Sequence, residues 1–310
     1  MITVCGEALI DLVTTDGRTF AAHPGGGPAN VAVSLSRLGV PAGLLGRVSG
    51  DTFGRLIEAH LRDNGVDLRD VTAAAEPTTL AVASVNDSGG ATYDFYVDGT
   101  ADFQWTVDTL PSPLADDVEA LYVGSLVAGV GPGAAAVEEL LRREHERGEV
   151  TTVLDPNVRP ALSPSHGRTL ARVERQVACS DLVKASDEDL RHLYPGADPE
   201  RIAQDWRDSG PAVVIITAGT EGALAVCRGS DETIWVPADP VIVVDTVGAG
   251  DSYLAGLLAA LRHEGRLARS GLQRLPADRL TVAMRVASRV AGITASRRGA
   301  DPPTAFELGW

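Results

Sequence analysis

The sequence has a single lysine, three cysteines and little positive charge. Its 310 residues carry 27 basic side chains against 42 acidic ones, which gives a net charge of −15. Every basic residue except Lys184 is an arginine. Because nucleic acids and anionic membrane surfaces bind proteins through clustered positive charge, this balance argues against both kinds of partner.

The sequence also lacks the patterns typical of a disulfide framework, a metal cluster or a membrane span. The cysteines, Cys5, Cys179 and Cys227, are odd in number and lack metal-ligand spacing. No apolar run approaches the roughly 18 residues that a membrane span requires, and the first residues do not resemble a signal peptide. We therefore expect a cytoplasmic protein with reduced thiols.

Short apolar runs alternate with helical segments, which predicts an α/β fold with a mainly parallel sheet. The expected strands are Ile2–Cys5, 120–126, 151–155, 182–184, 212–217, 223–228 and Val241–Val244, and the expected helices are 29–38, 52–64, 133–147, 165–178, 252–264 and 280–296. Residues 79–96 change to a period of two around a turn at 86–90, which predicts a β-hairpin, and a weaker hairpin is expected over 13–23. No linker or repeat divides the chain, so we expect one domain.

The heptapeptide DTVGAGD at 245–251 is predicted to form a strand end, a glycine turn and a helix start. Gly248, Ala249 and Gly250 carry little or no side chain, so a phosphate could approach backbone N–H groups that have no intrahelical partner. Asp251 follows at once and could accept a proton from a hydroxyl held against that phosphate. A simpler alternative for a lone G-x-G is a structural turn with Asp251 as the helix N-cap.

Two segments of the chain carry a family resemblance. DTVGAGD resembles the C-terminal signature of the ribokinase-like (PfkB) carbohydrate kinases, and GGGPAN at 25–30, followed by VAVSLSRLG, resembles their N-terminal signature. The resemblance implies a three-layer α/β/α domain over residues 1–310, with a mainly parallel central sheet. It also implies a small β-sheet lid built from about 12–24 and 78–105.

The same resemblance implies a set of catalytic and sugar-binding residues. Asp251 would be the catalytic base beside an anion hole at Gly248, Ala249 and Gly250. Arg159, in a segment similar to the family's DxNxR loop, would clamp phosphate or substrate. The residues implied to bind the sugar are Asp11, Gly26, Gly27, Asn30, Tyr96 and Asn157.

ATP, Mg²⁺ and K⁺ are the cofactors that the resemblance implies. The nucleotide would contact Lys184, Ser186, Thr217, Gly219, Gly222, Gly250, Gly299 and Ala300. Asp189 stands where the family has glutamate and would reach Mg²⁺ through a water, whereas Asp245 and Val247 would hold the monovalent cation. From the residues alone, Ser186 and Asp189 could equally be a helix-capping pair.

The resemblance implies ATP-dependent phosphorylation of a primary hydroxyl on a small sugar, with fructose favoured. The segment YDFYVDGTAD at 93–102 resembles the fructokinase lid pattern FYR-x-x-TAD, but Val97 replaces an arginine able to bind a carboxylate bidentately. Ketodeoxygluconate kinase, other sugar or nucleoside kinases and a non-catalytic sugar- or nucleotide-binding regulator are the alternatives. A dinucleotide oxidoreductase is rejected because no G-x-G-x-x-G follows the first strand. A homodimer formed through the lid is a possibility that the sequence does not decide.

Overall fold

The computed structural model describes residues 1–14, 16–85, 91–163 and 165–310, so the predicted turn at 86–90 lies outside the described residues. A central sheet of eight strands has the order β14-β13-β12-β11-β10-β9-β1-β4. Its strands are β1 (Ile2–Cys5), β4 (Ala42–Leu45), β9 (Ala120–Gly124), β10 (Thr151–Asp155), β11 (Leu182–Ser186), β12 (Val213–Thr217), β13 (Ala223–Cys227) and β14 (Ser230–Val236). Within this sheet β4, β1, β9, β10, β11 and β12 pair in parallel with their neighbours. Strand β13 pairs antiparallel with both β12 and β14. The predicted mainly parallel α/β fold is confirmed.

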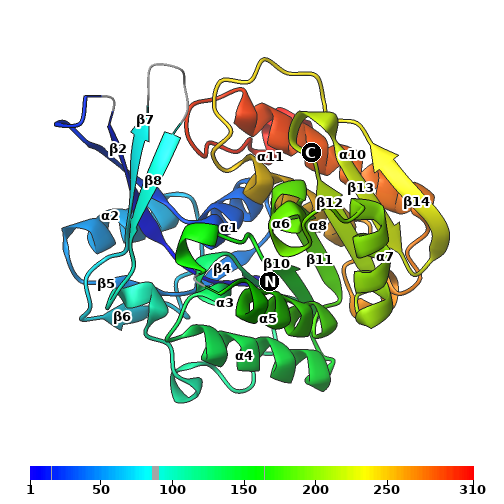
Figure 1. Ribbon diagram of the computed structural model, residues 1–310, viewed down its shortest axis with the longest axis horizontal. Coiled ribbons are helices and arrows are strands. Elements are labelled where there is room, and N and C mark those ends of the chain that lie inside the picture. Colours follow the sequence, from blue (N-terminus) through cyan, green and yellow to red (C-terminus); the bar gives the residue numbers. More distant parts are fainter. Residues whose placement is uncertain (15, 86–90, 164) are drawn as a thin grey trace.

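Helices cover both faces of the central sheet (Figure 1). One buried apolar cluster joins the sheet to α1 (Gly27–Arg37), α2 (Thr52–Asp63), α8 (Ala249–His263), α9 (Arg269–Leu272), α10 (Ala277–Ala295) and α11 (Ala305–Leu308). A second cluster joins the other face to α3 (Leu126–Gly129), α4 (Ala134–Arg147), α5 (His166–Ala178), α6 (Asp187–Leu193) and α7 (Pro199–Ser209). No helix among the described residues has both the length and the apolar character that a membrane crossing needs.

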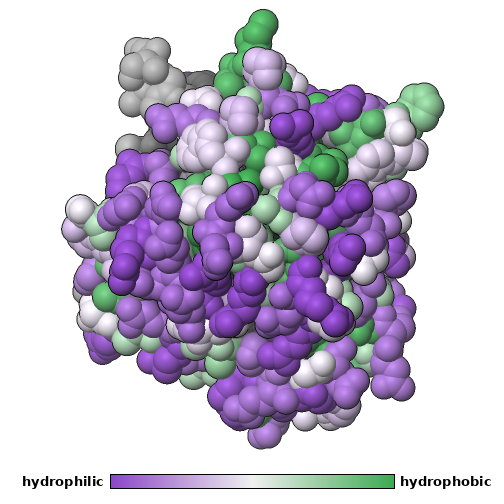
Figure 2. All heavy atoms as spheres, turned by 90° about the vertical axis from the view of Figure 1, so that its right-hand side faces the viewer, coloured by the Kyte–Doolittle hydropathy of each residue, from purple (hydrophilic) through white to green (hydrophobic). Residues whose placement is uncertain are grey.

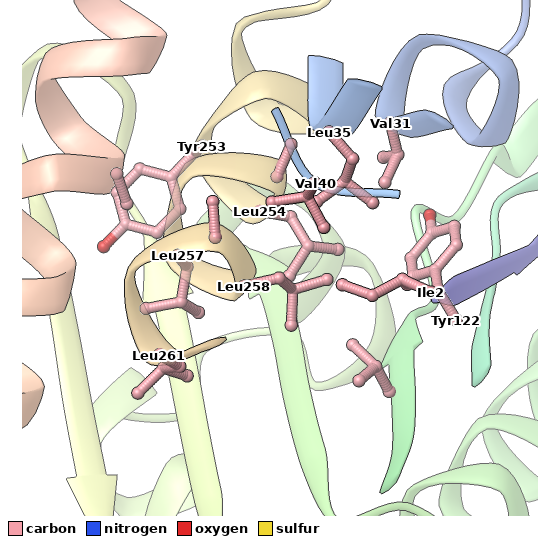
Figure 3. Packing of buried hydrophobic residues seen from close by; sticks show 14 of the residues in the cluster. Ile2, Val31, Leu35, Val40, Tyr122, Tyr253, Leu254, Leu257, Leu258 and Leu261 are labelled. Carbon is pink, nitrogen blue, oxygen red and sulfur yellow. The ribbon is translucent and has the colours of Figure 1, made fainter. Parts of the chain in front are cut away.

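Helix α8 is buried along most of its length, from Asp251 to Leu261. Figure 3 shows its leucines between the strands and the side chains of α1. On its other side α8 packs against α10 so closely that a Cβ atom on Gly256 would lie 2.9 Å from Val290 Cγ2. A helix that is apolar all round belongs in the core, so the sequence of α8 itself requires this central position.

A second, four-stranded sheet, here called the small sheet, stands beside the central one (Figure 1). It has the order β3-β2-β7-β8, with β2 (Leu9–Thr14), β3 (Ala21–Gly25), β7 (Leu80–Val85) and β8 (Ala91–Tyr96). The β2–β3 and β7–β8 pairs are antiparallel, as expected for hairpins, and β2 pairs with β7 in parallel. Strands β5 (Arg47–Ser49) and β6 (Thr72–Ala74) form a separate pair.

The strand expected at Val241–Val244 is wrong. This segment lies outside both sheets, and its side chains are exposed, Ile242 by 86%. The N–H groups of Val244 and Asp245 both donate to the Ala295 carbonyl at the end of α10, at 2.8 and 3.2 Å. These bonds tie the segment to the end of α10, and it pairs with no described strand of either sheet. Figure 2 views the molecule from that side and shows a mainly hydrophilic surface with apolar side chains gathered near its upper edge.

Two buried carboxyl groups hold the connection between β1 of the central sheet and β2 of the small sheet. Glu7 lies between β1 and β2, and its Oε2 accepts from the Val127 N–H at 3.3 Å. Asp102 follows β8 in a short 3₁₀ turn, and its Oδ1 accepts from the Ala8 N–H at 3.0 Å. Burial raises the pKa of each carboxyl to about 7, and the charge of Glu7 adds to the rise at Asp102.

Replacing Asp102 by asparagine should weaken the pH dependence of folding stability. Because the folded pKa of Asp102 is raised to about 7, the folded chain holds a proton that the unfolded chain releases near pH 4. The stabilisation is therefore complete at acid pH and is lost as the pH rises through 7. Urea unfolding between pH 5.5 and 8.5 should show a shallower decline for Asp102→Asn, whereas exposed Asp108→Asn should keep the parent's decline. An equal decline in Asp102→Asn and the parent would contradict the assignment.

Candidate active site

The glycine turn before α8 presents free backbone donors. Gly248 is the N-cap residue and adopts the left-handed conformation, with φ of 74°. The N–H groups of Gly250 and Asp251 donate to no acceptor in the described part of the chain. A Cβ atom on Gly250 would lie 3.3 Å from the Lys184 ammonium. The turn therefore offers an anion two amides and a nearby positive charge.

Asp251 is the third residue of α8, so the alternative that made it the N-cap is wrong. Its side chain is buried, and its Oδ2 accepts from Asn30 Nδ2 at 2.9 Å. Burial raises the pKa of Asp251, while the Asn30 hydrogen bond and the charges of Lys184 and Arg159 oppose that rise. The amide of Asn30 thus holds one carboxylate oxygen and leaves Oδ1 for another partner.

The only lysine of the chain lies buried beside this turn. Lys184 Nζ donates to Asp155 Oδ2 at 2.8 Å, and nothing in the described residues donates to Asp155 Oδ1. Burial lowers the pKa of Lys184, but Asp155, Asp189 and Asp251 outweigh it and leave that pKa raised. Burial also raises the pKa of Asp155 to about 6. Asp155 is the first residue of the segment similar to the DxNxR loop, and the sequence assigned it no role of its own.

The residues expected to bind the sugar come from three elements that meet next to Asp251. Asp11 lies on β2, and burial raises its pKa to about 6, with the Asp251 charge as the second cause. A Cβ atom on Gly27 would lie 3.2 Å from Ser125 Oγ and 3.4 Å from Asn157 Nδ2. Gly26, with φ of 101°, lies against the Glu7 carbonyl. Asp11, Gly26, Gly27 and Asn157 therefore surround the same space.

Tyr96 is not brought to that space. Asp11 pairs with Ala81, which pairs with Phe95, so these three side chains share one face of the small sheet. Successive side chains alternate between faces, which places Tyr96 on the other face, where it is 60% exposed. Tyr93 stacks on Phe95 with 6.0 Å between ring centroids. Burial and then the charges of Asp11 and Asp245 raise the pKa of Tyr93, so Tyr93 is the tyrosine that faces the site.

Ser186 and Asp189 form a capping box at the start of α6. Asp189 Oδ2 accepts from the Ser186 N–H at 2.8 Å and from its Oγ at 2.6 Å, and Asp189 Oδ1 accepts from the Val158 N–H at 2.7 Å. Both carboxylate oxygens are therefore occupied in holding the loop after β10 against α6. Among the described residues, no three His, Cys, Asp or Glu side chains are grouped to hold a metal.

Asp245 connects the glycine turn to the segment after α10. Its Oδ1 accepts from the Val247 N–H at 3.1 Å, and its Oδ2 accepts from the Gly299 N–H at 2.8 Å. A Cβ atom on Gly248 would lie 2.6 Å from Ala300 Cβ, so Ala300 packs directly on the turn.

The other candidate residues lie at neighbouring strand ends. Thr217 ends β12, and Gly219 and Gly222 shape the short connection to β13. Arg159, after β10, is exposed, and its Nη1 donates to the Val158 carbonyl at 3.3 Å. Since β10, β11 and β12 are adjacent and parallel, their carboxyl ends lie along one edge of the central sheet.

Comparisons with known proteins agree with this geometry. The family model described as pfkB family carbohydrate kinase matches residues 1–305. A fructokinase from Rhizobium leguminosarum bv. trifolii is 39% identical over 274 residues, which are 86% of this chain and 81% of the relative. The structure of a Xylella fastidiosa fructokinase with bound ATP matches with a TM-score of 0.90 and 25% identity, over 99% of this chain and 97% of that one.

A Vibrio cholerae fructokinase double mutant, in a form with fructose, ADP and potassium ion bound, also matches. Its TM-score is 0.82 at 26% identity, over 96% of this chain and 93% of that one. The predicted ribokinase-like fold is thereby confirmed. With a family model that extends over nearly its whole length, this chain belongs to the pfkB family of carbohydrate kinases.

Proposed function

We propose that this kinase transfers the γ-phosphate of ATP to a primary hydroxyl of fructose. The observation that carries the proposal is the buried Asp251 carboxylate, held by Asn30 beside two free amides and the Lys184 ammonium. The fructokinase relatives, and the fructose and ATP bound to the two matching structures, support the choice of both substrates.

Asp251 acts as the general base. Its Oδ1, left free by the Asn30 hydrogen bond on Oδ2, accepts the proton of the attacking hydroxyl. The N–H groups of Gly250 and Asp251 and the Lys184 ammonium stabilise the negative charge that spreads over the transferred phosphoryl oxygens. Asp155 keeps the lysine in place through its Oδ2.

Asp11, Asn30 and Asn157 orient the sugar through its hydroxyl groups. Gly26 and Gly27 let the backbone approach it closely. The small sheet serves as the lid, with Tyr93 and Phe95 on the face that carries Asp11. Covering the site excludes water that would otherwise compete for the phosphoryl group.

The nucleotide binds along the strand ends, at Thr217, Gly219 and Gly222, and between Ser186 and the Gly299–Ala300 segment. Mg²⁺, when bound, neutralises phosphate charge. Asp155 Oδ1, buried and without a partner in the described residues, suits that ion as a ligand better than Asp189, which would reach it only through water. Asp245 and Val247 would hold K⁺ beside the glycine turn, where the ion would add positive charge, and the potassium bound to the Vibrio cholerae fructokinase supports the choice of ion.

We further propose a homodimer formed through the small sheet and a cytoplasmic location. Tyr96 on β8 and Phe20, just before β3, are 60% and 44% exposed and give this side apolar surface that a second copy would cover. The cysteines are all free, and Cys5 and Cys227 are buried, as suits a reducing compartment.

Asp251→Asn should lower turnover by a factor of roughly 10² to 10⁴, because the amide cannot accept the hydroxyl proton. ADP binding, measured by calorimetry, should stay close to that of the parent, since asparagine keeps the shape of the side chain. The exposed Asp239→Asn serves as the matched control and should turn over normally. Turnover of Asp251→Asn within about threefold of the parent would remove Asp251 as the base.

Asn30→Ala should move the acid limb of the kcat/KM pH profile to higher pH. The Asn30 hydrogen bond lowers the pKa of Asp251, so its loss raises that pKa and leaves less of the carboxylate ionised at a given acid pH. The Asp251→Asn variant should lack this limb altogether. An acid limb that stays in place in Asn30→Ala would show that Asn30 does not tune the base.

Potassium should activate the enzyme, because a cation held at Asp245 adds positive field to the adjacent anion hole. The measurement compares initial rates in potassium with rates in a bulky organic cation at equal ionic strength. Identical rates would argue against a monovalent cation at Asp245.

The parent enzyme should prefer fructose to 2-keto-3-deoxygluconate. Val97 packs against the buried cluster that contains Phe103 and has no charge to offer the carboxylate of 2-keto-3-deoxygluconate. That carboxylate therefore lacks a charge-assisted bond worth roughly 1.5–3 kcal/mol. The measurement is kcat/KM for both sugars, where Val97→Arg should raise the value for the acid and exposed Val107→Arg should not. The second candidate substrate is 2-keto-3-deoxygluconate, because Arg159 has no carboxylate partner in the described residues and could bind the carboxylate of this sugar acid. A tenfold or greater preference of the parent for the acid would overturn the choice of fructose.

A further inference from the structure

A cavity of about 440 Å³ lies beside the sugar-binding residues, between α3, the loop after β10 and one side of α5 along most of its length. Ser125 and Asn157 line this cavity, and they also border the space next to Gly27. The remaining lining residues lie within 126–131, 156–163 and 165–176. The volume is that of a site for a small molecule.

The charge of the lining is opposite to that of the protein. Arg159, Arg168, Arg172 and Arg175 line the cavity, and none of its described lining residues is an aspartate or glutamate, although the whole chain carries a net charge of −15. The Arg172 and Arg175 side chains share one carboxylate, that of Glu138, at 3.2 and 2.6 Å. In the described part of the chain, Arg159 and Arg168 pair with no carboxylate. The four arginines of the lining therefore share only one described carboxylate, that of Glu138.

The backbone adds to this positive field. Helix α5 begins at the cavity, its N-cap Ser165 makes no side-chain cap, and its first turn holds no acidic residue. The free N–H groups of that turn thus complement the arginines as donors. Ser163 and Ser165 place hydroxyl groups on the same lining.

Ser125 and Asn157 form the wall between the cavity and the sugar site, and both have unusual backbone conformations. Ser125 and Asn157 have φ of 61° and 37°, and no other non-glycine residue among those described has a positive φ. The Asn157 amide Nδ2 donates to Ser125 Oγ at 3.4 Å, so the two residues contact each other across the wall. Such strained conformations persist where the surroundings hold them, and they concentrate at binding sites.

We propose that this cavity is a second anion-binding site, which takes a small phosphate monoester next to the sugar site. A phosphate monoester carries nearly two negative charges at neutral pH and matches the planar donor groups of arginine. Because Ser125 and Asn157 belong to both sites, the bound anion and the sugar contact opposite sides of the same wall. The proposal goes beyond the phosphorylation of fructose and does not require it.

Calorimetric titration of the full chain with inorganic phosphate and with glycerol 3-phosphate tests the site. ADP is present to occupy the nucleotide site, ionic strength is constant, and glycerol and acetate are the comparison ligands. Arg168→Gln is the test variant because Arg168 is exposed and pairs with no described carboxylate, so the variant should fold. Arg285→Gln is the matched control, an exposed arginine on α10 at the other face of the central sheet.

The parent should bind both phosphate compounds, with acetate at least tenfold weaker and glycerol not bound. Arg168→Gln should weaken phosphate binding tenfold or more, Arg168→Lys should retain most of it, and Arg285→Gln should leave it unchanged. Saturating fructose should not displace phosphate. Absence of binding to the parent at millimolar concentration, equal affinity in Arg168→Gln, or displacement by fructose would each overturn the proposal. The titration involves no turnover, so its result is separate from that of the kinase assay.

Discussion

The close packing of α8 between α1, α10 and the central sheet determines where the chemistry takes place. At Gly256 the approach to α10 leaves no room for a side chain, and the leucines of α8 fill the space above the strands (Figure 3). A helix packed this tightly cannot shift along its axis without opening cavities. Its N-terminus, with the glycine turn and Asp251, is therefore held at one place at the edge of the sheet.

Around that N-terminus the protein balances several buried charges. Asp155, Asp189 and Asp251 are all buried near the single buried lysine, and one ammonium cannot neutralise three carboxylates. The remaining balance comes from hydrogen bonds: Asn30 donates to Asp251, and Ser186 and Val158 donate to Asp189. Asp155 keeps one oxygen without a described donor, which leaves the site ready for a cation. The arrangement favours a substrate that brings Mg²⁺ with its phosphates.

The small sheet has a different role, because it carries Asp11 and the aromatic residues that share a face with it. Glu7 and Asp102 hold the connection between β1 and β2 through the backbone N–H groups of Val127 and Ala8, and the pKa of each carboxyl is raised by burial to about 7. The register between β2, β7 and β8 decides which aromatic residues face Asp11. Tyr93 and Phe95 lie on that face, and Tyr96 lies on the other.

The sequence alone predicted the fold class and a glycine turn followed by Asp251, since these depend on local patterns: buried strands, helices between them, and a turn that only small residues can form. It could not supply contacts between distant segments. Asn30 and Asp251 are 221 residues apart, and Lys184 meets Asp155 only because β10 and β11 are neighbours. Val241–Val244 has the composition of a buried strand, yet its backbone bonds to the end of α10 instead of to a strand, and Tyr96 matches a motif but lies on the face opposite Asp11. Pairing, register and the charge of a cavity arise from the order of elements in space, which only the tertiary structure decides.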